Sequence, residues 1–178
     1  SIPFIIAAEY GYFAEEGLEI ELIPFKSAME RDAALQSGSL DGAVSDLLAV
    51  IFARSGGFSV YATSYTDGSY NLVAGGNTDI ASAADLRGKE IAISRNTIIE
   101  YVTDEILAVN GVGEKDVSKV VIPQIPVRLE MLQSGNLAAA VLPEPMASVA
   151  EFSGSRYVTG SGELGINPGV IVFTDSAI

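Results

Sequence analysis

A strand and a helix meet in the stretch Glu90-Ile91-Ala92-Ile93-Ser94-Arg95-Asn96-Thr97-Ile98-Ile99-Glu100. Its first four residues are typical of a short buried strand, and apolar residues at helical spacing follow the turn. Thr97 and Glu100 have the spacing of a capping box, in which each side chain accepts a hydrogen bond from the other residue's backbone N–H. The stretch therefore predicts a strand over 90–93, a tight turn over 94–96 and a helix over 97–109.

This turn is the first candidate for a binding site. It gathers a hydroxyl, a guanidinium and an amide beside the free N–H groups of a helix N-terminus, which is a natural place to hold a polar ligand group. Turn formation explains Ser94 and Asn96 equally well, and helix capping explains Thr97 better than ligand contact does. The candidate ligand-binding residues of the turn are Ser94, Arg95, Asn96 and Thr97.

Composition indicates a folded, acidic protein. The chain has 178 residues, of which 48% are hydrophobic and 19% charged, and its net charge is −13. This length suits one domain or two small lobes, and the charge argues against a nucleic-acid partner. The absence of His and Cys excludes thiol catalysis and a Ser-His-Asp triad. No apolar run is long enough to span a bilayer. The chain begins at Ser1 without a signal peptide, so we expect a processed or cut piece.

Strands and helices alternate along the whole chain, which predicts an α/β fold with mainly parallel sheets and right-handed crossovers. The expected strands are 18–23, 42–45, 58–64, 71–74, 90–93, 117–122, 139–142, 156–159 and 170–173. The expected helices are 2–13, 28–37, 46–54, 82–86, 97–109, 125–134 and one that begins at Pro145.

An internal repeat divides the chain into two similar lobes. Residues 35–44 (LQSGSLDGAV) match residues 132–141 (LQSGNLAAAV), and in each copy a helix ends, a glycine stops it and a buried strand follows. The first lobe lacks a strand before Ile2 that would be the counterpart of 90–93, so we expect a truncated N-terminus. The predicted division is lobe I over 1–74 plus 170–178 and lobe II over 77–168, with crossings near 70–77 and 167–174.

Ligands in such sheets bind beyond the carboxyl ends of the strands, which adds the candidates Ser45, Asp46, Ser64, Tyr65 and Glu144. Helix capping explains Asp46 at least as well, Tyr65 either stacks on a flat ligand or covers the hinge, and Glu144 either contacts ligand or pairs with a helix dipole. Arg95 is the one basic candidate against two carboxylates. This balance favours a neutral or cationic heteroaromatic ligand, such as a thiamine precursor or a flavin-like ring, over a sulfonate.

Four pieces of sequence, in order, resemble a known family. They are Glu9-Tyr10-Gly11-Tyr12-Phe13 with Glu16-Gly17-Leu18; Ala34-Leu35-Gln36-Ser37-Gly38 with Leu40-Asp41; Asp85-Leu86-Arg87-Gly88-Lys89; and Leu132 to Pro145, ending in Glu144-Pro145. The chain resembles the NMT1/THI5-like solute-binding proteins of ABC importers, which take up alkanesulfonates, nitrate, thiamine precursors or riboflavin. The resemblance implies a type II periplasmic-binding fold that closes by hinge motion. The family's first strand and C-terminal helices are missing, and Ala138 stands where the first repeat has Asp41.

The resemblance also implies a function. We expect a monomeric, periplasmic or lipid-anchored extracytoplasmic protein that passes a small-molecule ligand to an ABC permease in the membrane, with no cofactor, no metal and no catalysis. An enzyme on the same fold, of the thiamine-pyrimidine or menaquinone-pathway type, is a competing hypothesis; the pyrimidine synthases rely on His, which this chain lacks. A sulfonate or nitrate binder is a third hypothesis, and the paired sensor lobes of a regulator are a fourth.

Overall fold

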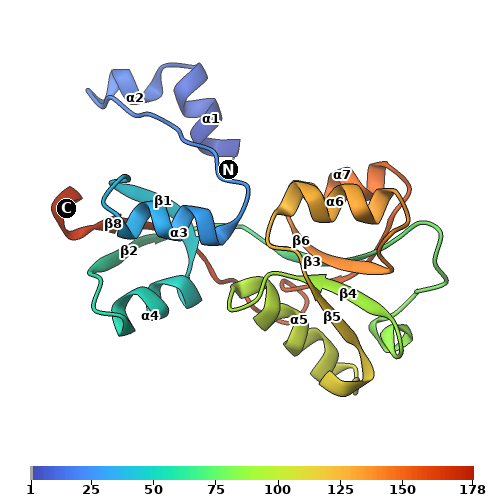
Figure 1. Ribbon diagram of the computed structural model, residues 1–178. Helices are drawn as coiled ribbons and strands as arrows, with labels where there is room; N and C mark the ends of the chain where they lie inside the picture. Colours follow the sequence, from blue (N-terminus) through green and yellow to red (C-terminus); the bar gives the residue numbers. More distant parts are fainter. Residues whose placement is uncertain (1) are drawn as a thin grey trace.

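Two β-sheets joined by two crossing segments form the protein in the computed structural model, which describes residues 2–178 (Figure 1). The strand orders are β1-β8-β2 in the first sheet and β5-β4-β6-β3-β7 in the second. The strands are β1 (Gly42–Asp46), β2 (Val60–Tyr65), β3 (Tyr70–Ala74), β4 (Glu90–Ile93), β5 (Ser118–Val121), β6 (Ala139–Pro143), β7 (Arg156–Gly160) and β8 (Gly169–Thr174). The α-helices are α1 (Ile2–Glu9), α2 (Tyr12–Glu15), α3 (Ala28–Gln36), α4 (Leu47–Ser55), α5 (Ile98–Val109), α6 (Ile125–Gln133) and α7 (Met146–Phe152). The predicted α/β fold of two lobes is confirmed.

Helices cover both faces of the five-stranded sheet. Along β3, Leu72 and Ala74 pack into a core with α5, whereas Val73 packs into a second core with α6 and α7. The alternation follows from the period of two along a strand, which sends successive side chains to opposite faces. Because both faces are covered, β3 is apolar at nearly every position and its central residues are fully buried.

The three-stranded sheet packs against α3 and α4. Leu35 from α3 and Ala53 from α4 share a core with Val60, Val170 and Val172 of the sheet. This core is smaller than either core of the other lobe.

The two lobes share one plan. The repeated sequences end α3 and α6, and the glycines that stop them, Gly38 and Gly135, have the same φ of 77°. The helices are followed by β1 and β6, each beside the strand that arrives from the other lobe: β1-β8-β2 corresponds to β6-β3-β7. The three-stranded sheet is antiparallel throughout, because β8 arrives from the other lobe and runs opposite to β1 and β2. The five-stranded sheet is mixed: β3 is antiparallel to β6 and β7, and β4 is parallel to β5 and β6. Parallel pairs are therefore fewer than the sequence predicts, since each lobe receives one strand from the other.

The crossings lie at 66–69 and 161–168, before the positions predicted for them. The segments predicted as crossings consist largely of β3 and β8, each of which lies between two strands of its sheet: β3 between β6 and β7, and β8 between β1 and β2. The predicted division places β3 in lobe I, but β3 pairs with β6 and β7 in the other sheet. The sequence could not show this, because sheet membership depends on partners that are distant along the chain.

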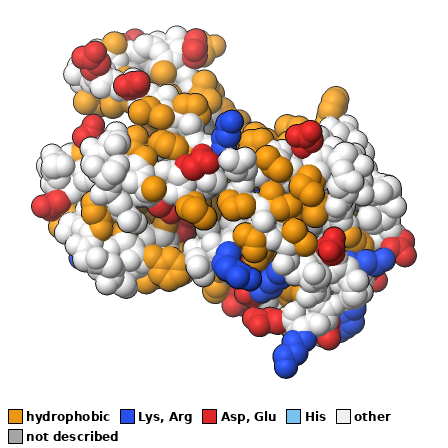
Figure 2. Space-filling model, viewed as in Figure 1, with side chains coloured by type: hydrophobic (Ala, Val, Ile, Leu, Met, Phe, Trp, Pro, Cys, Tyr) orange, Lys and Arg blue, Asp and Glu red, His pale blue; other side chains and the backbone are white. Residues whose placement is uncertain are grey.

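The N-terminal segment differs from prediction in two ways. The helix expected over 2–13 is divided into α1 and α2 at Gly11, whose φ of 76° interrupts the helix. Residues 18–23, predicted as a strand, pair with no strand among residues 2–178. Their alternation of apolar and acidic residues is that of a strand, but a strand needs a hydrogen-bonded neighbour. Apolar side chains of this segment, such as Leu18, are therefore exposed. Figure 2 shows hydrophobic side chains on the surface of the N-terminal part of the chain, at the upper left of the view.

Candidate functional site

The register of the strands brings the predicted site residues to two sheet edges. In the first sheet, Asp46 pairs with Gly169 and Tyr65 with Val170, so β1 and β2 end side by side with the start of β8 between them. In the second sheet, Tyr70 at the start of β3 pairs with Pro143 at the end of β6. The carboxyl ends of the strands in each lobe therefore share one edge.

Short crossings join these two edges. One runs from Tyr65 to Tyr70 and the other from Gly160 to Gly169. Ser161 donates its N–H to the Tyr70 carbonyl at 2.9 Å, and its Oγ accepts the Tyr70 N–H at 3.1 Å, so the crossings lie side by side. Leu48 of the first lobe also packs against the α5 core of the second. The edges that carry the candidate residues are therefore held close together.

The turn after β4 is built largely as the sequence predicts. Thr97 caps α5: its Oγ1 accepts the Ile99 N–H at 3.2 Å and donates to the Ser94 carbonyl at 2.7 Å. The predicted reciprocal bond is displaced by one residue, since Glu100 accepts the N–H of Asn96 at 2.6 Å. The displacement accompanies the left-handed backbone of Asn96, whose φ is 56°. Asn96 and Arg95 are at least partly open to solvent, unlike Ser94.

Ser94 is buried and engaged within lobe II. Its Oγ donates to the Pro123 carbonyl at 3.1 Å and accepts a hydrogen bond from Nη2 of Arg128 at 3.0 Å. Only 4% of the residue's surface is exposed. Ser94 therefore connects the turn to the interior of the lobe.

Asp46 caps the N-terminus of α4, which is the first of the two roles that its position in the sequence allows. Its Oδ1 accepts the Ala49 N–H at 2.9 Å, and its Oδ2 lies 3.5 Å from Nη2 of Arg31. Burial raises the pKa of Asp46, although the Ala49 N–H and the Arg31 charge act in the opposite direction. Burial alone would lower the pKa of Arg31, but the hydrogen bond and charge of Asp32 outweigh it and raise that pKa. Asp32 is thus the main counterion of Arg31.

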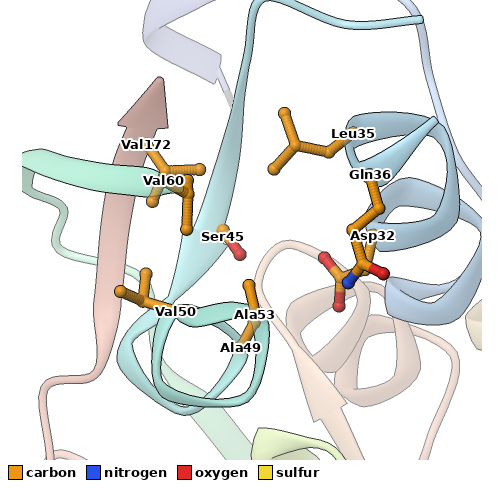
Figure 3. Close-up of a pocket in the computed structure, with 9 residues that line it drawn as sticks. All are labelled: Asp32, Leu35, Gln36, Ser45, Ala49, Val50, Ala53, Val60 and Val172. Atoms are coloured by element: carbon orange, nitrogen blue, oxygen red, sulfur yellow. The ribbon is translucent and has the colours of Figure 1, made fainter. Parts of the chain in front are cut away.

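Ser45 points into lobe I and not toward the other lobe. It is buried and lines a cavity of about 10 Å³ between α3 and α4 (Figure 3). This volume is enough for about one water molecule. On β2, at the other side of β8, Ser64 is exposed, and Tyr65 is 75% exposed with its ring free to contact a ligand.

Glu144 lies in a polar cluster at the end of β6. Its Oε1 accepts from Nδ2 of Asn71 at 2.7 Å, and its Oε2 accepts from the Ser148 hydroxyl at 2.8 Å. Nearby, burial and then the hydrogen bond and charge of Glu163 raise the pKa of Tyr157 to about 12. The charge of Glu144 contributes to the same shift. This side of the site is acidic and rich in hydrogen-bond acceptors.

Sequence reasoning missed Asn71 and Arg128. Asn71 is 7% exposed in β3, between β6 and β7, and holds Glu144 in place. Arg128 is fully buried and bonds both Ser94 and the Val141 carbonyl. A signal for each was present in the sequence. Asn71 interrupts an apolar strand, and Arg128 precedes the buried Leu132 by four residues, on the same face of its helix.

Other features lie away from these edges. An open groove of about 430 Å³ lies at the opposite end of lobe I, between the end of α3 and the end of β8. Across residues 2–178, no helix has the length and apolar character needed to cross a membrane. Within the same residues, no cluster of three or more His, Cys, Asp or Glu side chains is arranged to hold a metal ion.

Comparisons with known proteins extend this picture. The family model described as NMT1/THI5 like matches residues 1–151. Similar solved structures include the alkanesulfonate-binding protein SsuA from Xanthomonas axonopodis pv. citri bound to MOPS, with a TM-score of 0.83, 18% identity, and coverage of 97% of this chain and 62% of that one. The periplasmic aliphatic sulphonate binding protein SsuA from Escherichia coli is similar with a TM-score of 0.76 and 18% sequence identity. That comparison covers 97% of this chain and 58% of the other.

The substrate binding protein of an amino acid ABC transporter has a TM-score of 0.68 and 16% identity, covering 97% of this chain and 73% of that one. At these identities the likeness shows the fold alone. This chain spans about three fifths of the length of the two sulfonate-binding structures. Comparison with curated proteins gives no match.

Proposed function

Because this chain belongs to the NMT1/THI5-like family, we propose that it is a ligand-binding part of the solute-binding component of an ABC importer. One observation carries the proposal: the carboxyl-end edges of both sheets meet at the two crossings, and polar side chains gather at both edges. Ligands of α/β sheets bind beyond these edges. The similar structures, named as binding proteins for sulfonates and as part of an amino acid transporter, support the same role.

In the proposed site, the ligand lies between the lobes. Ser64 and Tyr65 contact it from lobe I, and Arg95, Asn96 and Glu144 contact it from lobe II. Four members of the predicted set have a supporting role: the buried Ser45, Asp46 and Ser94, which face the interior of their own lobes or bond within them, and the half-buried Thr97, which caps α5. The crossings act as the hinge by which the lobes close on the ligand.

The ligand that we propose contains a ring with hydrogen-bond donors, as in a thiamine precursor or a flavin. The exposed ring of Tyr65 supplies a face for stacking. The carboxylate of Glu144, fixed by Asn71 and Ser148, supplies an acceptor for a ring N–H or amino group. A sulfonate or nitrate ligand is the second candidate, and Arg128 favours it as a basic group beyond Arg95.

We also propose that the protein works outside the cytoplasm, as a monomer, and delivers its ligand to a permease without changing it. The sulfonate-binding structure from Escherichia coli is named as periplasmic, which supports this location. The proposal of no catalysis has its own test. A product that forms from a bound ligand only in the presence of folded protein would contradict it.

Two measurements test the proposed function. Mass spectrometry of small molecules released from the denatured protein identifies a ligand that copurifies. Calorimetry then compares thiamine precursors and flavins with taurine, nitrate and sulfate. We expect the ring compounds to bind more tightly. If taurine alone binds tightly, the second candidate is correct; if nothing binds and nothing is released, the binding function is contradicted.

A further inference from the structure

The two lobes also touch at a place outside the crossings. The start of α3 faces the start of α6 (Figure 1), and the Ile125 N–H donates to the Lys26 carbonyl at 3.0 Å. Beside this bond, Nε2 of Gln124 donates to Oε1 of Glu30 at 3.4 Å. Both acceptors lie at the start of α3 in lobe I, and both donors lie at the start of α6 in lobe II. Hydrogen bonds therefore connect the lobes directly.

This contact supplies a cap that α6 lacks in its own sequence. The first N–H groups of a helix have no partner within the helix. In α3 the hydroxyl of Ser27 accepts one of them, whereas Gln124, at the equivalent position before α6, makes no capping bond with its side chain. The Lys26 carbonyl accepts the N–H of Ile125, the first residue of α6, in its place. Lobe I therefore caps a helix of lobe II.

The charges at the contact suit the meeting of two helix starts. Each helix carries a partial positive charge at its N-terminus, so the two starts repel each other unless negative groups lie beside them. Glu30 provides a carboxylate: its Oε2 accepts the Lys26 N–H at 3.2 Å, while its Oε1 accepts from Gln124. If the lobes moved apart, α6 would lose this carboxylate and the Lys26 carbonyl together.

The contact lies at the sheet edge where the candidate residues gather. Gln124 follows β5, which runs parallel to β4, so the contact shares an edge with the turn over 94–97. The crossings that connect the same edges are held by the bonds between Ser161 and Tyr70. The lobes are thus joined at two separate places, by the crossings and by the starts of α3 and α6.

We propose that this contact, made by Lys26 and Glu30 with Gln124 and Ile125, is a latch that opens before the lobes move apart. The crossings keep the lobes connected when the latch is open, and the borrowed cap on α6 favours its closing. The inference rests on the proposed function in one respect, since it takes the crossings as a hinge. The latch itself involves no ligand, so its presence is measured independently of ligand binding.

Proline at position 125 tests the latch, because it removes the N–H that donates to lobe I. Proline is tolerated in the first turn of a helix, and Gln124 already has the extended backbone that a following proline requires. Ile125→Ala is the matched control, since it shortens the same side chain but keeps the N–H. The chain has no Cys, so spin labels on Ala33→Cys and Glu130→Cys, at exposed and equivalent positions of α3 and α6, report the distance between the lobes.

In dialysed protein without added ligand, we expect one narrow label distance for the labelled parent and for Ile125→Ala, and an additional, longer distance for Ile125→Pro. The Ile125 N–H of the unmodified protein should exchange with solvent at least about tenfold more slowly than an unprotected amide. This second measurement needs no variant, so it decides the matter if Ile125→Pro fails to fold.

The inference is overturned if Ile125→Pro and Ile125→Ala give the same distances, or if the Ile125 N–H exchanges at the unprotected rate. Failure of the proposed function has a different signature. In that case calorimetry finds no ligand, while the label distance still responds to proline and the Ile125 N–H remains protected, and the latch is supported.

Discussion

Asn71 and Glu144 are joined by a hydrogen bond of 2.7 Å between Nδ2 and Oε1, from the first residues of β3 to the residue that follows β6. β3 arrives from the other lobe, so this bond links a candidate ligand contact to the strand that follows the first crossing. If the crossings act as the proposed hinge, the strand that bears Asn71 connects their movement to Glu144.

Glu144→Gln should weaken ligand binding by about ten- to a hundredfold, because it removes the charge from a hydrogen bond to the ligand. Gln keeps one oxygen that can accept from Asn71, and its NH2 group can donate to the Ser148 hydroxyl, which then acts as acceptor. The melting temperature without ligand should therefore change little. Calorimetry and thermal unfolding measure the two effects, with the exposed Glu151→Gln as the control that keeps affinity. An intact affinity together with a lower melting temperature would show that Glu144 is structural.

Gly160→Ala should weaken binding without touching the ligand. A methyl group at Gly160 would collide with the side-chain oxygen of Asn71 and approach the Tyr157 hydroxyl. Asn71 must then shift, and Glu144 loses the hydrogen bond that the Asn71 amide donates. We expect both a lower affinity and a lower free energy of unfolding. Gly162→Ala, where a methyl group meets no atom, is the matched control. If Gly160→Ala and Gly162→Ala have the same affinity and the same free energy of unfolding, Asn71 does not position Glu144 for the ligand.

Asp46→Asn should stabilise the protein at neutral pH. Burial raises the pKa of Asp46 in the folded state, so folding favours the protonated form, and the charged form lowers stability above the unfolded pKa of about 3.9. Asn keeps the cap on α4 and carries no charge. Its advantage should therefore be present at pH 7 and disappear as the pH falls through the pKa of the folded protein.

Denaturant unfolding at pH 7 and pH 4 measures this difference. Asp46→Ala is the companion variant, since it removes the cap and should lose about 1 kcal/mol relative to Asn. If Asn is less stable than Asp at pH 7, the ion pair with Arg31 outweighs the cost of burial and the prediction fails.

The sequence predicts the locally determined parts of the fold well. Thr97 and Gly38 act through bonds and dihedral angles within a few residues, so the start of α5 and the end of α3 lie where expected. The prediction for residues 18–23 is wrong because their alternation specifies a strand but cannot supply its partner. For the candidate site, the sequence predicts where the turns lie but not where each side chain points. Ser45 points into its own lobe, and Arg128, a residue type usually at the surface, is buried in the core.

Thr97→Ala should lower the free energy of unfolding by about 1 kcal/mol through loss of the helix cap. Thr97→Ser keeps the oxygen that accepts the Ile99 N–H and should recover most of that stability. Asn96→Gly, which keeps the left-handed backbone of this position without strain, should behave in the opposite way, with weaker binding and little change in stability. Chemical unfolding and calorimetry of the three variants separate the roles. The assignment fails if Thr97→Ala impairs binding more than Asn96→Gly does.

Ser161→Ala tests the junction between the lobes. Ser161 is fully buried, and its Oγ accepts the Tyr70 N–H where the two crossings lie side by side. Alanine would leave this N–H without a partner, which costs about 1–3 kcal/mol of stability. If the crossings form a hinge, small-angle scattering should show that ligand makes the unmodified protein more compact and that the variant closes less completely. Ser153→Ala, at an exposed helix end, is the control. Equal compaction in all three proteins would show that this bond does not govern closure.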